Sequence, residues 1–475
     1  MNAVSAGNDT IVSALLQNGA NPNVNAGYRS SLKDAFNFTD SEPQKVAARI
    51  NIIHALIDAG AKPENDNVAA DCLFTAIAFP LPSNARANDQ DQQTKLIQSS
   101  LDLTKKLVST WNINLNRRGV YDLSPLMVAA IAGNGAVAKW LISQGADVGG
   151  IKHNDGSRSC EITVTGNKLY QISRNGSNDA LQFAITSRHP EVANFILGKD
   201  LDVKLIQNQA SFLWAVMYGD KTIVDAFLEK GMPADTRDGN GYTALMIALA
   251  HAELDIASSL IDKGANVNAI KGDRVAGIPA FDVGNKGWSG EFAWSPVTMI
   301  LANMKSDEKK DVLRKALALL LDKGADVSVE PPANLFRNYR DNFSVMNLAW
   351  ENASDLIPEL LKRGANPNAK DDQGQHELVW DAASFGRTEI LDELLAYGAN
   401  PNSAVSGAWG GKITALERAT ENGHVEAVKA LLDYGATVTA RAKTIAQQKG
   451  YSDVLQMFSQ APASPKKPGW KKTSA

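Results

Sequence analysis

One short phrase recurs along the chain at a nearly constant spacing. It is a pair of large aliphatic residues, two variable residues, Gly-Ala and then mostly Asn or Asp, as in Leu15-Leu16-Gln17-Asn18-Gly19-Ala20-Asn21. Copies lie 33 residues apart from Gly231 to Gly264 and 34 apart from Gly364 to Gly398. Such a period predicts a solenoid, in which each repeat buries its apolar face only against its neighbours. The glycines of the clearest copies are Gly19, Gly60, Gly145, Gly264, Gly324, Gly364, Gly398 and Gly435, and looser copies contain Leu107, Ile196 and Leu228.

The residue types in this phrase predict the end of a helix followed by a tight turn. The aliphatic pair lies in the last turn of the helix and faces inward, and glycine accepts the left-handed backbone conformation that stops a helix. Asn or Asp then starts a turn by hydrogen bonding to the backbone that follows it. Each repeat should therefore close with a short helix and a turn.

A second phrase opens the repeat, as in Ser124–Ala130, Thr243–Ala248 and Thr414–Ala419. Ser or Thr can cap the start of a helix, and the small alanines allow helices to pack closely. A glycine and a polar residue then separate the two helices of the repeat, as in Gly133-Asn134 and Gly423-His424. The phrases predict two short helices in every repeat.

In this order the three phrases resemble the ankyrin repeat, whose first helix begins with Thr-Pro-Leu-His-x-Ala. The resemblance covers about residues 1–460, in roughly eleven repeats. It implies an all-α solenoid of stacked helix pairs, joined by projecting turns that are called fingers. It also implies a single array without separate domains.

Four insertions depart from the regular repeat. The first separates the two helices of one repeat, and the other three lengthen fingers. In the second insertion, Glu161–Thr165 and Lys168–Ile172 flank Gly166-Asn167, a pattern that predicts a two-stranded hairpin with a two-residue turn. The insertions span about residues 79–95, 149–178, 268–294 and 328–343.

The two ends of the chain differ from the interior repeats. Asn2–Asn8 already has the pattern of the end of a first helix, which fits either a minimal cap or the loss of an upstream signal or anchor. We therefore expect a cytoplasmic protein if Met1 is the native start, and a periplasmic or membrane-anchored protein if an upstream signal was removed. The last repeat ends near Phe458, and residues 461–475, rich in Pro, Lys and Ser, are expected to form a disordered basic tail.

Charge, hydropathy and cysteine content narrow the classes of partner. The net charge is −4, so the chain lacks the basic surplus that neutralises nucleic-acid phosphates. No apolar run approaches the roughly 18 residues that span a bilayer. The two cysteines, Cys72 and Cys160, are too few for a disulfide framework and lie in different repeats, so we expect free thiols.

No residue pattern in the sequence predicts catalysis, metal binding or a cofactor. His376-Glu377 opens like a helical zinc-protease motif, but Trp380 stands where the second histidine is required. The six histidines are scattered over different repeats, and no Gly-Lys-Ser/Thr phosphate loop is present. A catalytic triad is recognised by geometry, and nothing in the sequence favours one. We therefore predict a protein that is not an enzyme and that holds neither metal nor cofactor.

Large aromatic residues in the three lengthened fingers, and in a fourth finger with a smaller extension at Ser403–Lys412, are the strongest indication of a binding surface. They lie on Gly-rich or Pro-rich segments, where no repeat core requires them. Because Trp and Tyr dominate binding hot spots, some of them should contact a partner protein. The alternative is that each insertion folds into a small aromatic cluster of its own. The candidate partner-binding residues are Tyr170, Trp288, Phe292, Phe336, Tyr339 and Trp409.

The resemblance to ankyrin repeats implies a module that holds another protein on its fingers and concave face. The long, individual fingers favour an inhibitor of an enzyme or toxin, because bacterial ankyrin proteins of this kind include immunity proteins. Two alternatives are a secreted or host-directed effector with its activity in the insertions, and a structural adaptor. The expected partner is another protein, with no nucleic acid, no small-molecule cofactor and no transmembrane segment.

Overall fold

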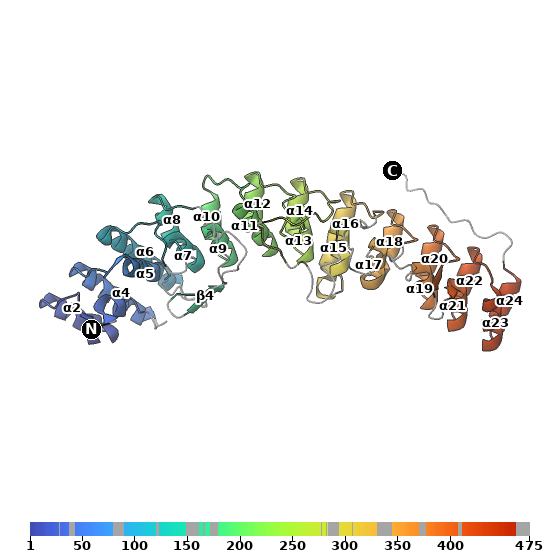
Figure 1. The fold of residues 1–475 in the computed structure, drawn as a ribbon, viewed down its shortest axis with the longest axis horizontal. Coiled ribbons are helices and arrows are strands. Elements are labelled where there is room, and N and C mark those ends of the chain that lie inside the picture. Colours follow the sequence, from blue (N-terminus) through green and yellow to red (C-terminus); the bar gives the residue numbers. More distant parts are fainter. Residues whose placement is uncertain are drawn as a thin grey trace. The chain divides into compact units, whose positions relative to one another are not determined.

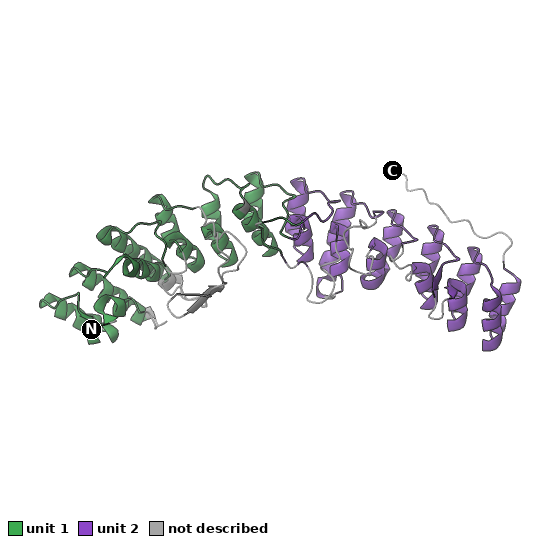
Figure 2. Cartoon of the chain, viewed as in Figure 1, with its two compact units in different colours: residues 1–239, 274–280 green, residues 240–273, 281–475 purple. Residues whose placement is uncertain are grey.

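The computed structural model of the chain describes residues 1–27, 29–37, 43–78, 90–119, 123–148, 161–164, 167–171, 179–276, 278–281, 283, 294–305, 307–329, 344–369, 377–406 and 411–461. They form two compact units, unit 1 with residues 1–239 and 274–280, and unit 2 with residues 240–273 and 281–475 (Figure 2). Short helices dominate both units, which fits the expected all-α repeat solenoid.

Unit 1 contains twelve helices and four short strands in the described ranges. The strands pair antiparallel, β1 (Asn25–Ala26) with β2 (Arg29–Ser30) and β3 (Glu161–Val164) with β4 (Asn167–Gln171). The helices are α1 (Asn2–Ser5), α2 (Asp9–Gln17), α3 (Ser31–Ala35), α4 (Pro43–Asp58), α5 (Asp66–Ile77), α6 (Gln90–Trp111), α7 (Pro125–Ala132), α8 (Gly135–Ser143), α9 (Ala180–Thr186), α10 (Pro190–Leu197), α11 (Ile206–Met217) and α12 (Lys221–Glu229).

Unit 2 repeats this organisation in its own described ranges. One antiparallel strand pair, β5 (Ala404–Ser406) with β6 (Lys412–Thr414), lies in a finger, and single 3-10 turns precede α16 and α18 at Asp307–Lys309 and Ser354–Leu356. The helices are α13 (Ala244–Ala250), α14 (Leu254–Asp262), α15 (Pro296–Asn303), α16 (Lys310–Asp322), α17 (Val345–Asn352), α18 (Ile357–Lys362), α19 (Leu378–Ser384), α20 (Thr388–Ala396), α21 (Ala415–Asn422), α22 (Val425–Asp433), α23 (Ala440–Lys449) and α24 (Ser452–Ser459).

The helices of each unit pack as consecutive pairs. Every odd-numbered helix contacts the even-numbered helix that follows it, so the described residues hold twelve pairs, six in each unit. Within unit 1, for example, α7, α9 and α11 stack in one layer, and α8, α10 and α12 stack in the other (Figure 1). The prediction gave roughly eleven repeats, because α23–α24 lacks the Leu-pair and Gly-Ala phrase used to find them. That the twelve pairs form a single array stays a prediction.

The sequence phrases have the local roles that their residue types suggest. The hydroxyl oxygens of Ser124, Thr243 and Thr414 each accept a hydrogen bond from the backbone amide three residues later, at 3.1–3.3 Å. At the other end of the repeat, the aliphatic pairs supply the core, since Leu260 and Leu394 are 0% exposed. Burial of these stripes between neighbouring helices holds each stack together.

A glycine in the left-handed conformation separates the two helices in several pairs. Gly133 and Gly423 end α7 and α21 with φ of 69° and 75°. Gly386 also makes room for the next repeat, because a Cβ there would lie 2.6 Å from His424 Nδ1. The pair α13–α14 places Ala252 at this point, with φ of 63°. Ala252, like Arg188 between α9 and α10 with φ of 64°, therefore carries the backbone strain that glycine avoids in α7–α8, α19–α20 and α21–α22.

Replacing Ala252 by glycine should raise the free energy of unfolding by about 0.5–1 kcal/mol. The gain is the relief of the left-handed conformation, reduced by the greater flexibility of glycine in the unfolded chain. Urea denaturation followed by circular dichroism measures it. Gly386→Ala is the matched control and should lose about 1–3 kcal/mol, because it combines the same strain with a clash against His424. A lower free energy of unfolding in Ala252→Gly would show that the left-handed conformation of Ala252 costs less than the flexibility that glycine adds to the unfolded chain.

Candidate functional site

A ladder of asparagine side chains fixes the base of the fingers to the next repeat. Asn268 Oδ1 accepts from the backbone amide of Asp326 at 2.7 Å, and Asn268 Nδ2 donates to the carbonyl of Gly324 at 3.1 Å. Asn368 makes the same two bonds, to Asn400 N at 2.8 Å and to Gly398 O at 3.2 Å. Asn23, Asn116 and Asn402 likewise accept from Lys62 N, Asp147 N and Thr437 N.

The sequence predicted that these asparagines form turns, and the structure adds hydrogen bonds from them to the next repeat. The first Asn of the phrase forms the predicted turn, since Asn266 Oδ1 accepts from Asn268 N at 2.9 Å. The link from the second Asn to the following repeat was missed, because nothing in a single repeat shows where the next backbone lies. Each finger base is thus hydrogen-bonded within its own turn and to the next repeat. These bonds position the residues beyond it.

Of the six candidate binding residues, only Tyr170 lies within the described residues. Tyr170 lies on β4, where its backbone pairs with Ile162. The described strands β3 and β4 begin at Glu161 and Asn167, so Asn167, predicted in the turn, is a strand residue. The shape of the rest of this finger stays a prediction. The other five candidates, Trp288, Phe292, Phe336, Tyr339 and Trp409, lie outside the described residues.

Two aromatic residues of the insertion at 268–294 are buried. Phe281 is 4% exposed and Trp294 is 1% exposed. The backbone amide of Lys271 donates to Trp294 O at 2.8 Å, and Lys271 Nζ lies 4.5 Å from the centroid of the Tyr242 ring. For these residues the structure favours the alternative that the insertion packs a small core of its own. It leaves Trp288 and Phe292 untested.

Three exposed aliphatic residues lie just beyond the finger turns. Val24 follows Asn23 directly and is 40% exposed, Leu205 takes the corresponding place and is 45% exposed, and Ile270 follows Asn268 by two residues and is 38% exposed. Sequence reasoning missed them because it searched the insertions for aromatic residues. The signal was an aliphatic residue one or two positions beyond the turn, where the repeat has no core position.

A second exposed group lies at the junction between the helices of a pair. Phe385 is 66% exposed, and its ring centroid lies 6.4 Å from that of Trp350. The Arg387 guanidinium lies 4.4 Å from the centroid of the Trp350 ring. This cation–π contact holds the arginine in place on the surface. Phe385 is thus an exposed aromatic residue that belongs to a helix junction and not to a finger.

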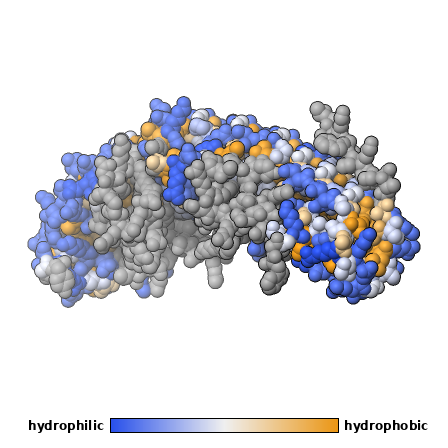
Figure 3. Space-filling view, turned by 45° about the vertical axis from the view of Figure 1, so that its right-hand side comes forward, coloured by the Kyte–Doolittle hydropathy of each residue, from blue (hydrophilic) through white to orange (hydrophobic). Residues whose placement is uncertain are grey.

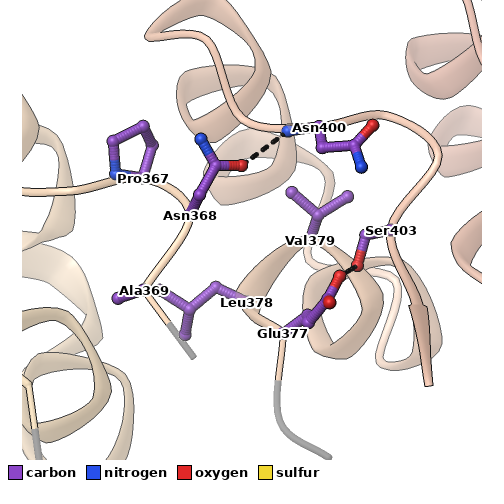
Figure 4. Close-up of a pocket in the computed structure, with 8 residues that line it drawn as sticks. All are labelled: Pro367, Asn368, Ala369, Glu377, Leu378, Val379, Asn400 and Ser403. Atoms are coloured by element: carbon purple, nitrogen blue, oxygen red, sulfur yellow. Dashed lines mark hydrogen bonds between the residues drawn. The ribbon is translucent and has the colours of Figure 1, made fainter. Parts of the chain in front are cut away.

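A small pocket lies between two finger bases of unit 2 (Figure 4). It encloses about 290 Å³. Glu377 stands at the start of α19, and its carboxylate accepts a hydrogen bond from the Ser403 hydroxyl of the next finger. A pocket of this size can receive one side chain of a partner. It is lined by Pro367, Asn368, Ala369, Glu377, Leu378, Val379, Asn400 and Ser403.

The described ranges contain no group of three or more His, Cys, Asp or Glu residues arranged to hold a metal ion. Burial raises the pKa of the Cys72 thiol, which keeps this free cysteine protonated and unreactive. Cys160 lies outside the described residues. No described helix is both long enough and apolar enough to cross a membrane.

The face drawn in Figure 3 is mostly hydrophilic where it is coloured, with hydrophobic residues in small groups. Isolated exposed hydrophobic residues are ordinary on protein surfaces. Their position in the repeat is therefore better evidence of a binding surface than their number.

Comparison with known proteins identifies the repeat. A family model of ankyrin repeats in three copies matches residues 181–271 and 345–442, and a model of the single ankyrin repeat matches residues 121–154. The chain is also similar to a protein of Treponema pallidum (strain Nichols) whose description names ankyrin repeats. The two are 26% identical over 168 residues, which cover 35% of this chain and 45% of that protein. The match thus spans less than half the length of the relative.

Proposed function

The chain carries ankyrin repeats, and from this premise we propose that its fingers bind another protein. Ankyrin repeats indicate a protein-interaction module, and enzymatic activity is not general among such proteins. The repeats stack through their helices and leave the fingers free to vary without loss of the core. The fingers are therefore where a particular partner can be recognised.

The observation that carries the proposal is the exposure of aliphatic residues close after the finger turns. Among the described residues, the large hydrophobic side chains that are exposed are Ile11, Leu15, Val24, Leu205, Ile270 and Phe385. Three of these, Val24, Leu205 and Ile270, lie one or two residues beyond a finger turn. Contact with a partner would remove them from water, at a gain of about 25 cal/mol for each Å² of apolar surface buried.

The aromatic candidates lie farther along the same kind of sequence segment. Trp288 and Phe292 follow Ile270 in one finger, and Trp409 follows the finger base that contains Asn402 and Ser403. We include Tyr170, Phe336 and Tyr339 because they too lie in lengthened fingers. A partner anchored by Trp and Tyr side chains would explain why the insertions hold so many.

The finer proposal is that binding inhibits the partner, as an immunity protein inhibits a toxin. It is supported by the individuality of the fingers, four of which differ in length and composition from the regular turn. A binding surface that is complementary to one partner can cover that partner's active site. If so, the purified partner should lose activity when the chain is added at a one-to-one ratio, and an adaptor would leave that activity unchanged.

Affinity capture with matched variants tests the binding proposal. The full chain is immobilised and incubated with a lysate of its source organism, and the retained proteins are quantified by mass spectrometry. The double variant Leu205→Asp/Ile270→Asp should retain at least about tenfold less of any specific partner, since tenfold corresponds to 1.4 kcal/mol.

Phe385→Asp is the control, because it places an aspartate at an exposed hydrophobic residue outside the fingers. It should capture the partner as the wild-type chain does. If the Phe385 variant loses the partner and the finger variant keeps it, the helix junctions bind the partner and the fingers do not.

A further inference from the structure

Asp179 is a buried carboxyl in a position that other pairs give to a hydroxyl. It caps α9 by accepting a hydrogen bond from Gln182 N at 2.7 Å, and it is only 3% exposed. A hydroxyl caps a helix without carrying charge, whereas a carboxylate buried here must lose its hydration. The hydroxyl residues at this position are Ser30, Ser124, Thr243, Ser295, Ser344, Thr414 and Thr439.

The helices around Asp179 supply no compensating charge. Three helices pack on α9, and two of them, α7 and α11, contain no titratable residue. The third, α10, contains only Glu191, at the end near His189, and α9 itself contains none. Arg188, which follows α9, places its guanidinium 4.2 Å from the centroid of the Tyr218 ring.

A second acceptor lies next to this carboxyl in the helix cap. Gln182, at the third position of α9, is 7% exposed, and its side-chain oxygen has no hydrogen-bond partner among the described residues. Side chains at the cap and third positions of a helix lie close together. An ionised carboxylate only accepts hydrogen bonds, whereas a protonated carboxyl also donates one. Protonation thus removes a buried charge and adds the donor that this cap lacks.

We propose that the helix pair α9–α10 is a pH-sensitive element, stabilised when Asp179 is protonated and loosened when it ionises. This pair directly follows the insertion at 149–178 in the sequence. Acidification would thereby tighten this pair, while the pairs whose first helix is capped by a hydroxyl group respond little.

The electrostatics give the direction of the effect. Burial raises the pKa of Asp179 from 3.8 to about 7, and hydrogen bonds from the Gln182 and Leu181 amides oppose the rise only in part. Because the folded-state pKa lies above the ordinary value, the carboxyl favours the folded state in acid. This contribution is complete below about pH 4, declines as the pH rises toward 7, and is lost above that.

Hydrogen exchange of the full chain tests the proposal. Protection factors of the α9 amides, corrected for intrinsic exchange, are measured at pH 5, 6, 7 and 8. In the wild type, protection should fall by up to about tenfold per pH unit between pH 5 and 7, the slope for one proton. Asp179→Asn should abolish this slope, and Asp179→Ser serves the same purpose if the asparagine variant does not fold.

Asp220→Asn is the matched control. Asp220 caps α12 by accepting from Ile223 N at 3.3 Å, but its side chain is only partly buried. This variant should keep the wild-type slope in α9. A flat wild-type profile from pH 5 to 8 would overturn the proposal, and so would an Asp179→Asn variant with the wild-type slope.

Discussion

Replacing Trp294 by alanine should lower the free energy of unfolding by about 3–5 kcal/mol. Trp294 is the largest fully buried side chain in the described ranges, and it precedes Ser295, the cap of α15. Its backbone amide donates to Thr298 Oγ1 at 3.0 Å, so the residue joins the finger insertion to that cap. The substitution would leave a cavity that this junction cannot close. Urea denaturation of the full chain measures the loss.

Trp294→Phe is the control, because it keeps an aromatic ring in the same space and should lose markedly less. Partner binding should survive both substitutions once the chain is folded, since a residue 1% exposed cannot contact a partner. If Trp294→Ala costs less than about 1 kcal/mol, the insertion does not form the core that we describe.

Replacing Asn134 by alanine should cost about 2–4 kcal/mol of stability. This side chain is 0% exposed and joins three helices of unit 1. Its Nδ2 donates to Ile77 O at 3.1 Å and to Ser100 Oγ at 2.9 Å, while its Oδ1 accepts from Val137 N at 3.2 Å. Alanine removes these bonds from Ile77 O and Val137 N, while Ser100 Oγ keeps its bond to Ala76 O at 2.6 Å. The melting temperature and the urea midpoint should both fall.

Asn8→Ala gives a matched comparison in the same unit. Asn8 has the equivalent place before α2, where it accepts from Ile11 N at 3.0 Å but is exposed. Its loss should cost only about 0.5–1 kcal/mol, the usual contribution of a helix cap. Equal losses in the two variants would mean that the buried bonds of Asn134 contribute nothing beyond capping.

The regular parts of the fold follow from short sequence patterns. Thr243, the paired aliphatics at Leu260-Ile261 and Gly264 each act within a few residues, so their roles can be read without knowledge of the rest of the chain. Asn268 and Asn134 are different, because half of their function is a bond to another repeat. A single sequence does not show which backbone atoms will face them.

The candidate site was less predictable for a related reason. An aromatic residue in an insertion can face a partner or pack against its own finger, and the composition is the same in both cases. Trp294 and Phe281 pack inward, and Val24 and Leu205, which seemed unremarkable as aliphatics, are exposed. Exposure depends on which neighbours cover a residue, and the irregular fingers have no repeated pattern from which that can be inferred.

The most direct test of binding by the fingers pairs two measurements on the same variants. Affinity for the captured partner is measured by calorimetry and stability by thermal melting, for Trp288→Ala, Trp409→Ala and the core variant Leu394→Ala. The finger variants should lose at least about 2 kcal/mol of binding, near thirtyfold in affinity, with an unchanged melting temperature. Leu394→Ala should lose about 2–5 kcal/mol of stability and keep its affinity while folded. Finger variants that melt earlier and bind as tightly as the wild type would contradict this account.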